Sequence, residues 1–237
     1  MSGNKIIFIC TVLVTVLSSY KTQNTTISKD FVLGKFNYKV HPDFIKVHSI
    51  HSAKTLYLQT RVYDSFIKMY NAARENGIDL KILSGTRNFN EQKAIWERKW
   101  KSNSNLKPLD NAKTILRYSS MPSSSRHHWG TDIDLIRLNN SYFETNRGKK
   151  EFDWLTKHAN SFGFYQVYTP KTDGRQGYNL EKWHWSFLPL ASKYLNFYNK
   201  TINYNDFKEF DGAYLAKELQ IIEHYVNGIS EQTLHYN

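Results

Sequence analysis

The sequence is nearly free of cysteine. Its 237 residues contain one, Cys10, which lies inside an apolar N-terminal run. If that run is removed, the remaining chain has no thiol, which excludes disulfides, cysteine-rich zinc sites and a cysteine nucleophile. Proline (5) and glycine (11) are also scarce, whereas hydrophobic residues make up 40% and aromatic residues 15%. This composition predicts a packed globular protein and not a disordered tail.

Acidic residues are outnumbered by basic ones, 21 to 32, which gives a formal net charge of +11. Such a charge favours attraction to polyanions, including nucleic acid, anionic lipid and an anionic cell wall. The lysines are scattered along the chain, and no helix-turn-helix, RNP or zinc-finger pattern is present. We therefore expect no nucleic-acid partner and interpret the charge as a general surface property.

One long hydrophobic run is present, at the N-terminus. Residues 6–17 form a twelve-residue apolar stretch that follows Lys5 and ends at Ser18-Ser19. This layout predicts a signal peptide at residues 1–19, because a membrane span needs roughly 20 apolar residues. We expect an exported protein of the periplasm or cell envelope with no stable membrane span after removal of the signal. A flexible leader would follow at 20–30, and residues 31–237 would form a single domain with a helical C-terminal extension.

The hydrophobic pattern predicts helices and short strands along that domain. Apolar residues three or four apart predict helices at 56–76, 90–101 and 149–161, with shorter helices at 112–118, 189–199 and 214–226. Alternating apolar and polar residues predict strands at 78–83, 164–169 and 181–187. Asn88 or Asn90 is suited to cap the second helix, and residues 102–111 read as a loop by composition.

Two segments carry a dense group of potential metal ligands. His127, His128, Asp132 and Asp134 lie within ten residues, and Glu181 and His184 follow about fifty residues later. Zinc prefers imidazole nitrogen and carboxylate oxygen, and a catalytic zinc keeps three protein ligands and one open position. His127, Asp134 and His184 would supply such a set.

Spacing alone leaves alternatives open. His128 has the same chemistry as its neighbour His127, and in a strand Asp132 and Asp134 point to the same face. A Ser-His-Asp triad from Ser125, His127 and Asp134 is possible by residue type, but the nucleophile-elbow pattern is missing. His41, His48 and His51 have no standard ligand spacing, so we interpret them as packing or surface residues.

The motifs resemble those of a known family. Residues 125–134 match SxHxxGxxxD, Glu181–His184 matches ExWH, and Ser84–Gln92 is similar to SGxRxxxxQ. Together they resemble the M15 metallopeptidases, the VanY-like and VanX-like D-alanyl-D-alanine peptidases. The family spacing favours His127, Asp134 and His184 as zinc ligands. It also implies an α+β fold of the LAS metallopeptidase type, in which helices flank a small central antiparallel sheet and the zinc lies in a cleft.

The position of Glu181, three residues before His184, suits a base that takes a proton from the attacking water without binding the ion. The resemblance implies that Arg87 faces the negative charge that develops on the scissile carbonyl oxygen. Ser125 and Gln92 would hold the terminal carboxylate of the substrate or orient the zinc ligands.

The resemblance therefore implies a zinc carboxypeptidase that removes the C-terminal D-Ala from peptidoglycan stem peptides, and we expect it to be a monomer. An L,D-carboxypeptidase and a D,D-dipeptidase of the same fold are the rival enzymes. A non-catalytic cell-wall-binding module is the alternative from a different class. The presence of Glu181 and Arg87 argues against such a module, because binding alone needs no base.

Overall fold

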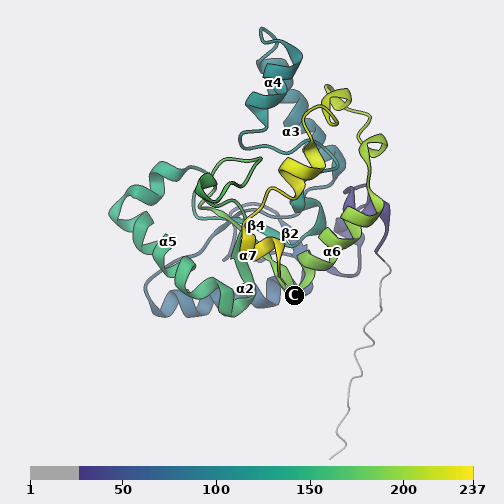
Figure 1. Ribbon diagram of the computed structural model, residues 1–237. Helices are drawn as coiled ribbons and strands as arrows, with labels where there is room; N and C mark the ends of the chain where they lie inside the picture. Colours follow the sequence, from purple (N-terminus) through teal and green to yellow (C-terminus); the bar gives the residue numbers. More distant parts are fainter. Residues whose placement is uncertain (1–26, 237) are drawn as a thin grey trace, which may run out of the picture.

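A four-stranded antiparallel sheet lies at the centre of the computed structural model, which describes residues 27–236 (Figure 1). Its strands run in the order β3-β4-β6-β5 and comprise β3 (Ile82–Ser84), β4 (Asp132–Leu135), β5 (Phe164–Gln166) and β6 (His184–Phe187). A separate antiparallel pair is formed by β1 (Phe44–Lys46) and β2 (Tyr57–Gln59). The predicted α+β fold with a small antiparallel sheet is confirmed.

Helices surround the sheet. They are α1 (Lys29–Val32), α2 (Thr60–Glu75), α3 (Phe89–Ser102), α4 (Pro108–Ile115), α5 (Asn146–His158), α6 (Leu188–Thr201) and α7 (Glu231–Leu234). Residues of α2 and α5 pack into one hydrophobic cluster, and residues of α3, α4 and most of those of α6 pack into a second. In Figure 1, α3 and α4 accordingly stand together, away from α2 and α5.

The two faces of the sheet differ in chemistry because side chains alternate along a strand. On β4 and β6, four apolar side chains enter the cluster formed with α2 and α5: Ile133, Leu135, Trp185 and Phe187. The alternate positions are all polar: Asp132, Asp134, His184 and Ser186. The strand register places Asp134 opposite His184 and Asp132 opposite Ser186. One face is therefore core, and the other carries the polar group.

Helix α3 starts directly after Arg87. The Asn88 side chain accepts a hydrogen bond from the Glu91 backbone N–H at 2.9 Å, and Glu91 Oε2 accepts one from the Asn88 backbone N–H at 2.9 Å. This reciprocal capping box satisfies two free donors at the helix start. Of the two predicted caps, Asn88 is therefore the correct one.

Several predicted boundaries are wrong. The helix predicted from residue 56 starts at Thr60, because Tyr57–Gln59 pairs with β1 instead. The predicted strand 78–83 is shortened to Ile82–Ser84. Much of the predicted loop at 102–111 is helical, since α4 begins at Pro108, a residue well suited to the first helical position.

The single helix predicted at 214–226 is also wrong. The chain forms a 3-10 turn at Ala213–Leu215 and a π-helical segment at Ile221–Val226. Gln220 lies between them with a φ of 49°. This left-handed conformation interrupts a right-handed helix.

The predicted signal peptide at 1–19 lies outside the described residues, as does the predicted leader up to residue 26. The end predicted for the leader is wrong, because Lys29 and Asp30 belong to α1, which Ser28 caps by accepting a hydrogen bond from the Phe31 backbone N–H. Within residues 27–236, no helix has the length and apolar character needed to cross a membrane.

Candidate metal centre

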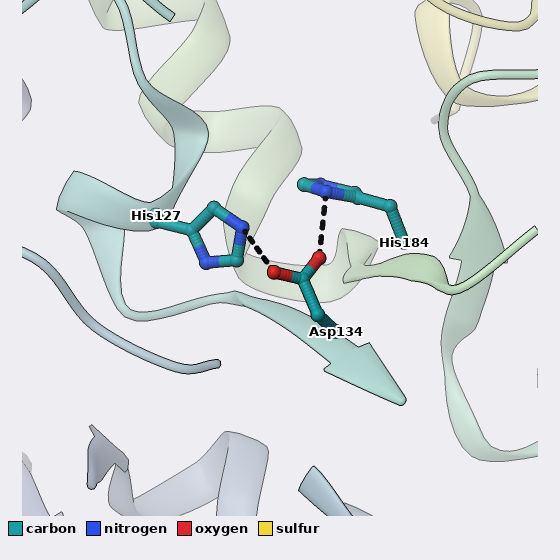
Figure 2. A group of neighbouring side chains, drawn as sticks. All are labelled: His127, Asp134 and His184. Atoms are coloured by element: carbon teal, nitrogen blue, oxygen red, sulfur yellow. Dashed lines mark ion pairs between the residues drawn. The ribbon is translucent and has the colours of Figure 1, made fainter. Parts of the chain in front are cut away.

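His127, Asp134 and His184 meet at one point. His127 Nε2 lies 3.4 Å from Asp134 Oδ2, and His184 Nδ1 lies 3.2 Å from Asp134 Oδ1. In Figure 2 the carboxylate of Asp134 faces both imidazoles, one from each side. One ligand atom from each residue lies within 4.8 Å of the others, and all three residues are buried. The fold thus brings together three possible metal ligands, of which the first and last, His127 and His184, are 57 positions apart in sequence.

Gly130 positions the first of these residues. His127 belongs to a 3-10 turn, Arg126–Trp129, and Gly130 ends this turn with a φ of 69°. A Cβ atom at this glycine would lie 2.4 Å from Cε1 of Phe44. A side chain here would therefore be opposed both by the left-handed backbone and by a steric clash.

In each imidazole, the nitrogen that faces away from Asp134 has a hydrogen-bond partner of its own. His127 Nδ1 donates to the carbonyl oxygen of Gly85 at 2.9 Å, and His184 Nε2 donates to Asp132 Oδ1 at 3.0 Å. With these protons assigned, His127 Nε2 and His184 Nδ1 turn their lone pairs toward Asp134. Three electron-pair donors that face one another fit a divalent cation between them, and the nitrogen and oxygen set suits zinc.

Asp132 has a different role from Asp134. Its oxygens accept hydrogen bonds from Arg126 Nε at 3.0 Å, Thr131 Oγ1 at 2.6 Å and Ser186 Oγ at 2.9 Å, besides that from His184. Asp134 Oδ1, in contrast, has no hydrogen-bond partner. Asp132 therefore supports the imidazole of His184, whereas Asp134 retains free lone pairs for an ion.

Arg126 and Ser186 are site residues that the sequence analysis missed. The buried guanidinium of Arg126 also lies over the ring of Trp129, with its Cζ 4.9 Å from the ring centroid. Its Nη2 donates a hydrogen bond to Ser186 Oγ at 2.8 Å. The signal for Ser186 was available in the alternation along residues 184–187. No sequence signal pointed to Arg126.

His128, the alternative ligand, points elsewhere. Its Nδ1 donates to the carbonyl oxygen of Arg87 at 2.7 Å, and the backbone N–H of Arg87 donates to the carbonyl oxygen of His127 at 3.1 Å. The segments around residues 85–87 and 127–128 are thus joined by hydrogen bonds. His128 is not part of the cluster that could hold a metal.

Charges around the cluster shift the pKa of its members. Burial raises the pKa of the Glu181 carboxyl, whose Oε2 lies 3.4 Å from His184 Nδ1. Burial alone would lower the pKa of His184, but the carboxylates of Asp132, Asp134 and Glu181 outweigh it and raise that pKa well above its usual value. For Asp134, burial is outweighed by His127 and His184, so its pKa falls well below the usual range. The carboxylates of Asp134 and Glu181 thus stabilise positive charge beside the imidazoles, where a bound cation would lie.

A cavity of about 500 Å³ opens beside the cluster. Arg87, Gln92 and Glu181 line it together with the three clustered residues. Arg87 is buried, its Nη1 donates to Ser84 Oγ at 2.6 Å, and burial lowers the pKa of its guanidinium. Ser125 is buried but is not among the residues that line this cavity, and its Oγ has no hydrogen-bond partner. Its predicted contact with substrate stays a prediction.

A cluster of two imidazoles and a carboxylate, with a further carboxylate beside it in a cavity, is typical of metal-dependent hydrolases. Residues 55–190 match the family model described as VanY, D-alanyl-D-alanine carboxypeptidase. The chain belongs to this family, and the three motif segments all lie within the matched region.

YodJ of Bacillus subtilis (strain 168), whose carboxypeptidase name is itself provisional, is 27% identical over 138 residues. That match covers 56% of this chain and 46% of YodJ, so the chain spans less than half of this relative.

Three solved structures share the fold. VanYB in complex with D-alanine-D-alanine has a TM-score of 0.51 at 19% identity, over 71% of this chain and 93% of that one. The LD-carboxypeptidase LdcB has a TM-score of 0.52 at 18% identity, over 72% of this chain and 81% of that one. A VanY mutant from a VanB-type resistance cassette, solved in complex with Zn(II), has a TM-score of 0.51 at 18% identity, over 67% and 86%. The LAS-type metallopeptidase fold is thus confirmed.

Proposed function

We propose that this chain is a zinc-dependent carboxypeptidase that removes the C-terminal D-Ala from peptidoglycan stem peptides. The observation that carries the proposal is the convergence of His127, Asp134 and His184 with Glu181 beside them in a cavity. Membership of the VanY family supports the substrate class. The predicted signal peptide supports action outside the cytoplasm, in the periplasm or cell envelope.

The three clustered residues would hold the ion. When bound, zinc lowers the pKa of a coordinated water to about 7 and polarises a carbonyl oxygen. Asp132 and the Gly85 carbonyl keep the two imidazoles in the tautomers that expose Nδ1 of His184 and Nε2 of His127. The protein thus supplies a preorganised donor set.

Glu181 would take a proton from the attacking water and return it to the leaving amine. Its burial favours this role, because a raised carboxyl pKa lies closer to the working pH of a general base. Arg87 would face the negative charge on the carbonyl oxygen, held by its hydrogen bond to Ser84. Gln92 lines the same cavity and is placed to orient the peptide.

The rival functions differ in substrate and turnover. An L,D-carboxypeptidase would release D-Ala from a tetrapeptide, and a D,D-dipeptidase would cleave the free dipeptide. A wall-binding module would bind peptide without turnover, which the buried Glu181 beside His184 argues against.

The test is to measure zinc content by mass spectrometry and D-Ala release from a stem pentapeptide, the matching tetrapeptide and the free dipeptide. We expect about one zinc per chain and D-Ala release from the pentapeptide. Release from the tetrapeptide alone would identify the L,D-carboxypeptidase. Zinc without turnover on any of the three peptides would favour a binding module.

A further inference from the structure

Lys99 lies on the wall of the same cavity but has no place in the mechanism above. Helix α3 places Gln92, Ile95 and Lys99 on the cavity side, at spacings of three and four residues. Such a spacing puts the three side chains on one helix face. The wall thus carries an amide, an apolar side chain and an ammonium group in succession.

The ammonium group of Lys99 is held in place by a neutral partner. Its Nζ donates to Ser119 Oγ at 2.5 Å, and Ser119 also lines the cavity. Within residues 27–236, no carboxylate forms an ion pair with Lys99 or with Arg87. The two carboxylates that line the cavity, Asp134 and Glu181, pair with imidazoles instead.

The ammonium group of Lys99 thus has a hydrogen-bond partner but no ion-pair partner among the described residues. Lys99 is half-buried, and an ammonium group that is partly removed from water is stabilised by a partner of opposite charge. Burial lowers the pKa of Lys99, and the positive charges of Arg98 and Arg87 lower it further, against a smaller opposing effect of Glu181. An anion in the cavity would offset both the burial and the repulsion.

We propose that Lys99, held by Ser119, binds a carboxylate of the substrate peptide and so determines which peptides the cavity accepts. This inference rests on the proposed carboxypeptidase function. The carboxylate has two possible sources, the free C-terminus and an acidic group on an upstream residue of the stem peptide. Both offer the same charged oxygen acceptor to an ammonium donor.

The experiment measures peptide binding by calorimetry to zinc-loaded protein that carries Glu181→Gln to suppress turnover. Three pentapeptides are compared: one with both carboxylates free, one with the C-terminus amidated, and one with the upstream carboxylate amidated. We expect Lys99→Met to weaken binding of the free peptide by ~10- to 100-fold, the range for a hydrogen bond to a charged group. The amidated peptide that lacks the recognised carboxylate should show no such loss, which identifies the source.

Matched variants separate recognition from other effects. Lys101→Met removes an exposed positive charge from the same helix and should change binding less than about twofold, since exposed charges contribute little. Lys99→Arg keeps the charge and should retain much of the affinity. Equal losses for all three peptides, or none, would overturn the proposal. It would also be overturned if the Glu181→Gln protein with Lys99 intact bound no peptide.

The two proposals can fail separately. If the zinc-loaded wild type releases no D-Ala, the carboxypeptidase proposal fails, whereas the calorimetry still reports whether Lys99 recognises a carboxylate.

Discussion

His184 Nε2 lies 3.0 Å from Oδ1 of Asp132, on the side of the imidazole opposite to Asp134. Arg126, Thr131 and Ser186 fix Asp132 in turn through further hydrogen bonds. A carboxylate that accepts the outer N–H of a metal-binding histidine fixes the tautomer and raises the basicity of the inner nitrogen. The sequence analysis treated Asp132 as a rival ligand, and its contacts give it a supporting role.

Replacing Asp132 should therefore weaken zinc binding without removing a ligand. We expect Asp132→Asn to raise the zinc dissociation constant by about 10- to 100-fold, the usual effect of losing an outer partner. Competition with a chromophoric chelator measures this constant. Asp153→Asn, a change at an exposed position of α5, is the control and should leave zinc affinity unchanged. Equal affinities for Asp132→Asn and wild type would contradict the supporting role.

Glu181 should be needed for turnover and not for zinc. We expect Glu181→Ala and Glu181→Gln to keep zinc and to lower kcat by about 10²- to 10⁴-fold, the range for a lost general base. The measurement combines D-Ala release with zinc content. Glu144→Gln, which removes an exposed carboxylate paired with Lys182, serves as the control. A Glu181→Ala variant with near-normal activity would remove the base assignment.

Gly130 and Gly77 offer a matched pair for testing the turn after His127. Both have a positive φ, 69° and 70°, but only at Gly130 would a Cβ atom clash, since nothing lies within 4 Å of one at Gly77. We expect Gly77→Ala to cost about 1–2 kcal/mol for the left-handed backbone. Gly130→Ala should cost about 1–3 kcal/mol more, because Phe44 must move. Chemical unfolding of both variants checks this, and equal costs would contradict the packing argument.

The three clustered residues were predictable because their signals are local. Alternation along β4 and β6 places Asp134 and His184 on one face, and the motif spacing favoured His127 over His128. The hydrogen bond from Arg126 to Ser186 was not predictable, because it joins residues 60 positions apart and depends on the pairing of β4 with β6. Long-range register of this kind leaves no periodic trace in the sequence.

The fold was predictable in class but not at its element boundaries. Strand β6 starts at His184 and not at 181, because Glu181 opens a turn in which its carbonyl oxygen accepts the His184 N–H at 3.3 Å. This turn lets Glu181 approach the ring of His184, which a straight strand would not do at a spacing of three residues. The boundary error therefore lies where the site departs from regular structure.

His51 lies in an aromatic cluster, apart from the residues of the metal centre. Its ring packs against Tyr63, Phe66 and Tyr70, and its Nδ1 lies 2.6 Å from the Tyr63 hydroxyl. That hydroxyl oxygen already accepts the His48 backbone N–H, so its hydrogen is free to reach a neutral Nδ1. Burial lowers the pKa of His51, and the positive charges of His48 and Lys81 lower it further, against an opposing effect of Asp79.

A lowered pKa in the folded state means that the unfolded chain binds the proton more readily. The stability linked to His51 is therefore complete above about pH 6.5, the value for an unfolded histidine, and is lost as the pH falls below it. We expect the unfolding free energy of the wild type to drop more between pH 7.5 and 5.5 than that of His51→Phe, which keeps an aromatic ring without a titrating group. Urea unfolding at the two pH values measures both drops. Parallel pH profiles for the two proteins would show that His51 stays equally protonated in the folded and unfolded chains, contrary to this account.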